Sequence, residues 1–200
     1  MELVSLLLLL VVGYFTLKKR EQRQRIVLLA RHLGQYPIEK LMETLANGYL
    51  RALGENDPQR REQVWRYLDA TETQLYDQFN RFCAEFAKLD AANTRVSKLA
   101  LGVPFATTLF PQATFDLRQA FAIHARGFEQ AAVNSLNLSP KDKAFTLSAE
   151  LFLMQHTCHW FCNSKAVASA RLIARHKTSY AQVLAAVGAD TRTAYLALTG

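Results

Sequence analysis

The feature that most constrains this chain is an uncharged apolar run near its beginning. From Leu3 to Leu17 the sequence reads LVSLLLLLVVGYFTL, fifteen residues without a charged side chain, and the run stops at Lys18. As a helix it is about 22 Å long, shorter than the roughly 30 Å hydrocarbon core of a bilayer. Tyr14 and Phe15 lie where aromatic side chains meet lipid headgroups, and long basic side chains can reach the interface. The run predicts a transmembrane anchor over residues 1–17.

Two other structures could explain the same run, a cleaved signal peptide and a buried core helix. A signal peptide carries positive charge before its apolar segment and a small-residue cleavage site after it, and neither is present. A core helix would suit the short length but does not explain five consecutive leucines. Because the basic residues follow the run, the positive-inside rule predicts that the N-terminus lies outside the cell membrane and the remainder in the cytoplasm.

A basic segment, residues 18–36, follows the anchor, and we expect it to continue the anchor helix as far as Gly34. Between Lys18 and Arg31 the net charge is +5, whereas the middle of the chain is close to neutral. The basic side chains nearest the anchor are the expected contacts with lipid headgroups: Lys18, Lys19, Arg20, Arg23 and Arg25. A plainer interpretation is that these residues serve only to stop transfer through the membrane.

The remaining residues, 37–200, have the spacing of an all-α domain. Pro37 to Gly54 predicts one helix, and a second begins at Pro58 behind the cap Asp57. In the second helix apolar positions recur every three or four residues, and the three phenylalanines among them fit the core of a bundle better than a two-stranded coiled coil. That stripe consists of Val64, Leu68, Thr71, Leu75, Phe79, Phe82, Phe86 and Leu89.

Residues 99–115 form an apolar segment that cannot be one helix, because Gly102, Pro104 and Pro111 interrupt it. A buried loop would leave backbone groups without partners, so one interpretation is an exposed patch that binds a membrane surface or a partner protein. The other is a loop packed against the bundle. The side chains expected in the patch are Leu101, Val103, Phe105, Leu109 and Phe110.

A further helix is expected from Thr114 to about Leu136, and the segment after Ser139 predicts one long helix or two abutting ones. Residues 144–163 approach the polarity of a membrane span, but the polar side chains inside them favour a buried central helix. This segment also contains a string of imidazoles and thiols, a combination that suits zinc. The metal-binding alternative uses His156, Cys158, His159 and Cys162, completed by His124 or Cys83, although such residues on an apolar helix usually belong to the core.

The last segment, residues 179–198, has the pattern of a helix-turn-helix around Gly188. Arg192 and Thr193 would then open a recognition helix, which gives a second alternative, a membrane-anchored DNA-binding regulator. The mostly apolar end of the chain also fits a helical hairpin that closes the bundle.

Signatures of catalysis are absent from the sequence: we find no nucleophile elbow, phosphate loop, kinase string, zinc-protease motif or dinucleotide-binding glycines. We therefore expect an all-α protein, an N-terminal transmembrane helix followed by a cytoplasmic bundle of about six helices. Its expected role is that of a non-catalytic membrane-tethered interaction or assembly protein, such as a subunit of an inner-membrane complex, in contact with membrane lipids and other membrane proteins and without a cofactor.

Overall fold

The structure is a computed structural model that describes residues 2–200, which form ten α-helices, one 3₁₀ turn and two short strands. The long helices are α1 (Glu2–Leu33), α2 (Ile38–Gly54), α3 (Pro58–Phe86), α6 (Leu117–Val133), α7 (Pro140–Cys162), α8 (Lys165–His176), α9 (Tyr180–Ala186) and α10 (Ala189–Thr199). The short elements are α4 (Ala91–Thr94), β1 (Arg95–Ser97), α5 (Ala106–Leu109), η1 (Pro111–Ala113) and β2 (Thr114–Asp116). The predicted all-α bundle is confirmed.

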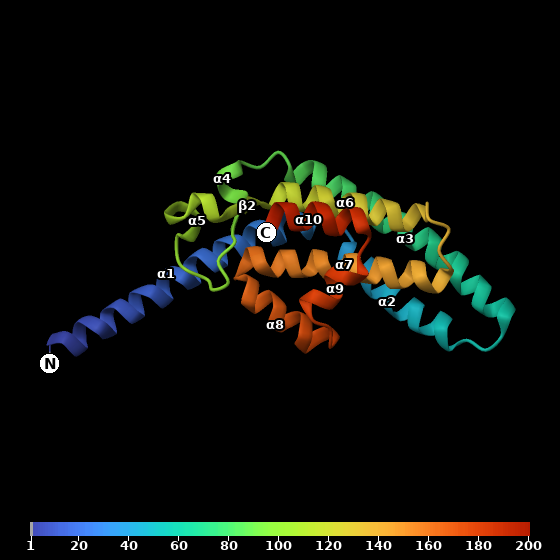
Figure 1. Cartoon of the computed structure of the whole chain (residues 1–200), viewed down its shortest axis with the longest axis horizontal. Coiled ribbons are helices and arrows are strands. Elements are labelled where there is room, and N and C mark those ends of the chain that lie inside the picture. The colour runs from blue at the N-terminus through green and yellow to red at the C-terminus, as the bar shows by residue number, and fades with distance from the viewer. Residues whose placement is uncertain (1) are drawn as a thin grey trace.

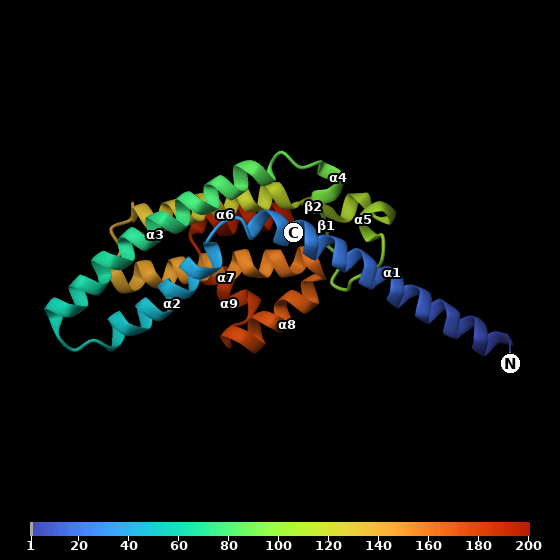
Figure 2. The ribbon, with the colours of Figure 1, turned by 180° about the vertical axis from the view of Figure 1, so that it is seen from behind.

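The molecule is elongated, and the first half of α1 projects from one end of the bundle (Figures 1 and 2). Helix α7 runs through the middle, where it packs against α6, α8 and α9 and also against α1 and α2. Residues 144–163 thus lie in the central helix of the bundle. The turns between α2 and α3 and between α6 and α7 lie at the end away from the projecting part of α1 (Figure 1).

The core forms where α3 packs against α6. The predicted α3 stripe is buried from Leu68 to Phe86, with Val64 and Leu89 at its partly buried edges. Phe79 and Phe82 contact Phe121 of α6 with ring centroids 6.0 and 5.1 Å apart, and Phe79 lies 4.7 Å from Phe128. The three- and four-residue spacing therefore marks a wide bundle core, as predicted.

Helix boundaries follow the caps that the sequence contains. Asp57 accepts hydrogen bonds from Gln59 N and Arg60 N, and Ser139 accepts one from Asp142 N. The segment after Ser139 is two abutting helices, because the backbone leaves the helical region at Asn163 and Ser164 caps α8.

A two-stranded antiparallel sheet is one of the elements that the sequence did not predict, together with the short elements α4, α5 and η1. Val96 lies opposite Phe115, with one pair on either side, and the strands are three residues long. Since Thr114–Asp116 is a strand, α6 starts at Leu117 and not at Thr114. Runs of three residues are too short for a period of two to be recognised.

The transmembrane part of the predicted fold is not confirmed. Within residues 2–200, no helix has both the length and the apolar character that a membrane crossing requires.

Candidate membrane-contact surface

The first half of α1 is an apolar arm, residues 4–17, that has little contact with the bundle. Its large hydrophobic side chains are between 39% and 71% exposed: Val4, Leu6, Leu7, Leu8, Leu9, Leu10, Val11, Val12, Tyr14, Phe15 and Leu17. Figure 1 shows the arm extending away from every other element. Exposed apolar surfaces that extend over many adjacent side chains are typical of sites that contact a membrane or another protein.

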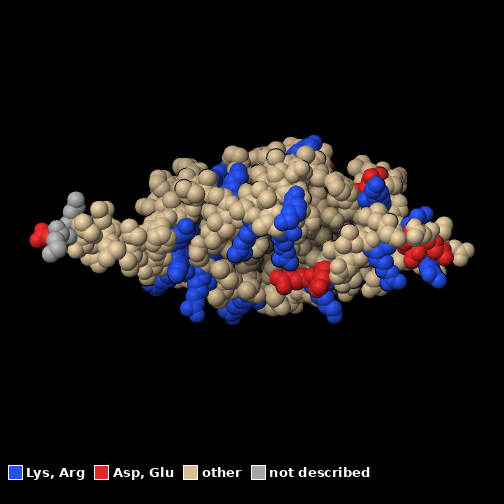
Figure 3. Space-filling model, turned by 90° about the horizontal axis from the view of Figure 1, so that it is seen from below, with Lys and Arg blue, Asp and Glu red and all other residues tan. Residues whose placement is uncertain are grey.

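Basic side chains surround α1 where the arm meets the bundle. Lys19, Arg20 and Arg23 are exposed, and Lys18 is half-buried with its ammonium 5.8 Å from the Tyr14 ring. In Figure 3 the blue side chains begin directly after the tan arm. Four of the five predicted headgroup residues therefore form a basic collar, which we define as Lys18, Lys19, Arg20 and Arg23.

The fifth predicted headgroup residue, Arg25, points inward. Its guanidinium donates to Phe161 O at 3.0 Å and to Glu21 Oε1 at 2.8 Å, and it lies 5.3 Å from the Phe161 ring. Phe161 O is one of the last carbonyls of α7, where a cation complements the helix dipole. Arg25 thus joins α1 to the end of α7 and is only 17% exposed, so its guanidinium is less accessible than the three exposed side chains of the basic collar.

The apolar segment between the strands forms a loop, residues 99–113, beside the base of the arm. Its predicted patch residues are exposed: Leu101 70%, Val103 36%, Phe105 51%, Leu109 62% and Phe110 48%. Tyr14 Oη donates to Gly102 O at 2.8 Å, and Phe105 N donates to Glu21 Oε2 at 3.0 Å. The fold therefore brings the patch beside the collar, through hydrogen bonds between residues that lie 88 and 84 positions apart in sequence.

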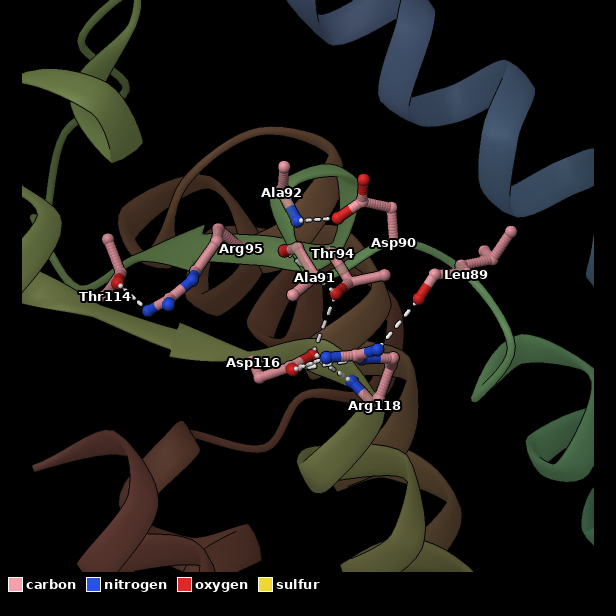
Figure 4. Close-up of polar contacts among 9 residues, drawn as sticks. All are labelled: Leu89, Asp90, Ala91, Ala92, Thr94, Arg95, Thr114, Asp116 and Arg118. Atoms are coloured by element: carbon pink, nitrogen blue, oxygen red, sulfur yellow. Dashed lines mark hydrogen bonds and ion pairs between the residues drawn. The ribbon is translucent and has the colours of Figure 1, made fainter.

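An ion pair fixes the base of this loop (Figure 4). Arg118 donates to Asp116 Oδ2 at 2.6 Å and to Leu89 O at 2.8 Å, and Thr94 Oγ1 donates to Asp116 Oδ1 at 2.9 Å. Burial alone would raise the pKa of Asp116, but the bonds from Arg118 and Thr94 outweigh it and hold the pKa below its usual value. On β1, Ser97 O accepts a hydrogen bond from Trp160 Nε1 at 2.8 Å.

The predicted metal ligands do not converge. Among the described residues, no group of three or more His, Cys, Asp or Glu side chains is placed to hold a metal ion. His156 stacks on Tyr180 and bonds Ser169, His159 bonds Arg171, and the Cys158 thiol contacts Met154. Burial raises the pKa of Cys162 to about 11, which disfavours the thiolate that zinc binds.

The other two predicted ligands, His124 and Cys83, form part of the protein core. His124 Nε2 lies 2.9 Å from Thr157 Oγ1, which in turn lies 2.8 Å from Tyr195 Oη. Burial, with a smaller effect from His156, lowers the pKa of His124 to about 3, so its imidazole is neutral. Burial raises the pKa of Cys83 to about 12, and its thiol donates to Phe121 O.

The predicted helix-turn-helix corresponds to α9 and α10. Helix α10 packs against α6, with Thr191, Tyr195 and Thr199 buried in that contact. Arg192 and Thr193 are exposed on the opposite face, and Arg192 is the one basic residue of α10. The arrangement is that of a hairpin that closes the bundle.

A buried carboxylate lies next to the turn between α9 and α10. Glu150 is 1% exposed, and its Oε1 accepts a hydrogen bond from Gly188 N at 2.9 Å. Burial raises the pKa of Glu150 to about 7, and the hydrogen bonds from Gly188 and Thr191 offset only part of that effect. Since the folded protein holds this proton more tightly than the unfolded chain, the contribution of Glu150 to stability is fully present below the ordinary pKa of glutamate and is lost as the pH rises through about 7.

Glu150→Gln is therefore expected to stabilise the protein in alkaline but not in acidic solution. The raised pKa corresponds to a difference of roughly 3 kcal/mol at pH 8.5 between the free energies of unfolding of the variant and the wild type. Little of this difference remains below pH 4.5. Urea unfolding at a series of pH values measures this difference. Glu129→Gln, an exposed carboxylate on α6, is the matched control and should leave the profile unchanged. If stability depended on pH in the same way in the two variants, Glu150 would not be the group that makes the protein less stable in alkaline solution.

Comparisons of the chain with protein-family models, with curated proteins and with solved structures give no match.

Proposed function

We propose that this protein is a non-catalytic, membrane-tethered interaction or assembly protein. The observation that supports the proposal is the apolar arm, residues 4–17, whose large hydrophobic side chains are exposed and have little contact with the bundle. Burial of apolar surface contributes about 25 cal/mol per Å², so lipid is a far better environment than water for these side chains. Tethering raises the local concentration of the bundle near other membrane components, which is how it would promote assembly.

The arm in this proposal is a single-pass anchor whose N-terminal end faces outward. Its uncharged run is about 22 Å long, and local thinning of the bilayer together with extended Lys18 and Lys19 side chains would accommodate the difference. The basic collar follows the arm, so the positive-inside rule favours a cytoplasmic bundle. A phosphatase reporter fused after Gly200 should be inactive and a fluorescent reporter bright; an active phosphatase would contradict this orientation.

Charge placed in the arm is expected to release the protein from membranes. An arginine at the centre of a membrane helix costs about 2.5–3.5 kcal/mol, so Leu8→Arg should lower partitioning into lipid roughly a hundredfold. Flotation of the full-length protein with phosphatidylcholine–phosphatidylglycerol vesicles measures this partitioning.

Leu50→Arg is the matched control for the arm variant. Leu50 is 72% exposed on α2 and lies outside the arm, so the same chemical change there should leave flotation unaltered. If wild-type protein failed to float, or if both variants floated like wild type, the arm would not be the tether.

A further inference from the structure

The exposed loop lies beside the part of α1 where the arm ends. Its hydrogen bonds to α1 involve Tyr14 and Glu21, which are seven residues apart and so about 10 Å apart along the helix. This stretch of α1 contains Lys18, Lys19 and Arg20 of the basic collar. If the arm is in lipid, the loop lies at the level where hydrocarbon gives way to headgroups.

The loop has the composition that this level of a bilayer favours. Residues 99–113 contain no charged side chain. Leu101 and Leu109 are 70% and 62% exposed, and two phenylalanines are about half exposed. Aromatic and aliphatic side chains next to a basic cluster are typical of segments that lie in a membrane interface.

The loop is held in shape, so these side chains stay exposed. Lys98 N donates to Ala113 O at 2.8 Å, which closes the loop at the strands, and Ala166 N donates to Ala100 O at 3.0 Å. Phe105 has a φ of 56° and a ψ of 21°, a left-handed conformation that is unfavourable for a residue with a β-carbon. The same residue donates its backbone N–H to Glu21 and leaves its ring 51% exposed. Strain at a residue that both contacts α1 and exposes an aromatic ring is a mark of a functional position.

We propose that the loop of residues 99–113 is a second membrane contact, which inserts Leu101, Phe105, Leu109 and Phe110 into the lipid interface around the base of the arm. The inference rests on the proposed tether. We assign lipid, not a protein partner, as what the loop contacts. The loop is uncharged, is bonded to α1 at the level of the basic collar and continues the apolar surface of the arm. Two contacts would prevent the bundle from swivelling on its anchor, so the turns at its far end would point away from the membrane.

Site-specific fluorescence in vesicles tests the second contact. An environment-sensitive dye is attached to Leu109→Cys in the loop, to Val11→Cys in the arm or to Leu136→Cys at the far end of the bundle, each in full-length protein with its natural cysteines replaced by alanine. Leu136 is 78% exposed and serves as the matched control. The vesicles contain phosphatidylcholine and phosphatidylglycerol, with a quencher on a fraction of the lipid chains.

We expect a blue shift and quenching at positions 11 and 109, and neither at position 136. Quenching at position 11 without quenching at 109 would overturn the loop contact and leave the tether intact, whereas quenching at neither would overturn the tether itself. A blue shift at position 109 in native membranes but not in protein-free vesicles would identify a protein partner and overturn the assignment to lipid.

The cysteine replacements have their own control. If the alanine background fails to unfold cooperatively, the three natural cysteines are retained, because burial raises the pKa of Cys83, Cys158 and Cys162 and so slows their labelling.

Discussion

Lys143→Met is expected to lower the free energy of unfolding by about 3–5 kcal/mol, because it leaves a buried carboxylate without its cation. Lys143 Nζ lies 2.6 Å from Glu72 Oε2 and 2.7 Å from Asp69 Oδ1, and Tyr49 Oη donates to Glu72 Oε1 at 2.6 Å. Glu72 is 2% exposed. Burial alone would lower the pKa of Lys143, but its bonds with Asp69 and Glu72 raise it, so the ammonium is retained.

Equilibrium unfolding in urea measures this loss, and the chain provides a matched control two residues away. Lys141 is exposed on the same first turn of α7, so Lys141→Met should change stability by less than about 0.5 kcal/mol. A second substitution, Glu72→Gln, should restore most of the stability of the Lys143→Met protein, since it removes the buried charge. Equal midpoints for the Lys143 and Lys141 variants would show that this ion pair does not stabilise the fold.

Local sequence signals predicted most of the helices correctly. Asp57-Pro58 and Ser139-Pro140 start α3 and α7 where expected, since a side-chain oxygen at the cap and a proline at the first helical position act within one turn. In α6 the three- and four-residue spacing of Leu117, Phe121, His124, Phe128 and Ala131 in the sequence likewise marks residues that are buried. These features depend on residues three or four apart, so a single sequence contains them.

Contacts between distant residues could not be predicted in the same way. Lys143 and Glu72 both occur in ordinary helical sequence, and only the fold brings the first turn of α7 close enough to α3 for them to pair. Arg25 has the sequence context of a headgroup contact, but the end of α7 supplies the carbonyl that turns it inward. The hydrogen bond from Tyr14 to Gly102 joins residues 88 apart, so the position of the loop beside the arm became visible only in the structure.

Apolar composition alone could not decide whether α7 crosses a membrane or lies buried in the bundle. Residues 144–163 are almost as apolar as a membrane span, yet twelve residues of α7 are buried by its neighbours in the bundle. A helix buried on all sides needs apolar residues all round whether lipid or protein surrounds it. The arm of α1 is also apolar but lacks such neighbours, and this difference is what makes it the candidate tether.

Phe79→Ala is expected to destabilise the protein by about 3–5 kcal/mol, the usual cost of removing a fully buried aromatic side chain. Phe79 is 0% exposed, and its ring pairs with Phe82 on α3 and with Phe121 and Phe128 on α6. The cavity that the substitution leaves cannot close easily, because α3 and α6 form its walls and the remaining aromatic rings keep these two helices apart. Thermal unfolding followed by circular dichroism should show one cooperative transition at a clearly lower temperature.

Phe145→Ala is the matched control, because Phe145 is 67% exposed on α7 and loses little buried surface when truncated. Phe79→Leu should lie between the two, since leucine fills part of the cavity but cannot reproduce the edge-to-face contact with Phe121. Vesicle binding of Phe79→Ala below its melting temperature should equal that of wild type, because the arm has little contact with this core. Loss of stability in Phe145→Ala as large as in Phe79→Ala would contradict the placement of the core between α3 and α6.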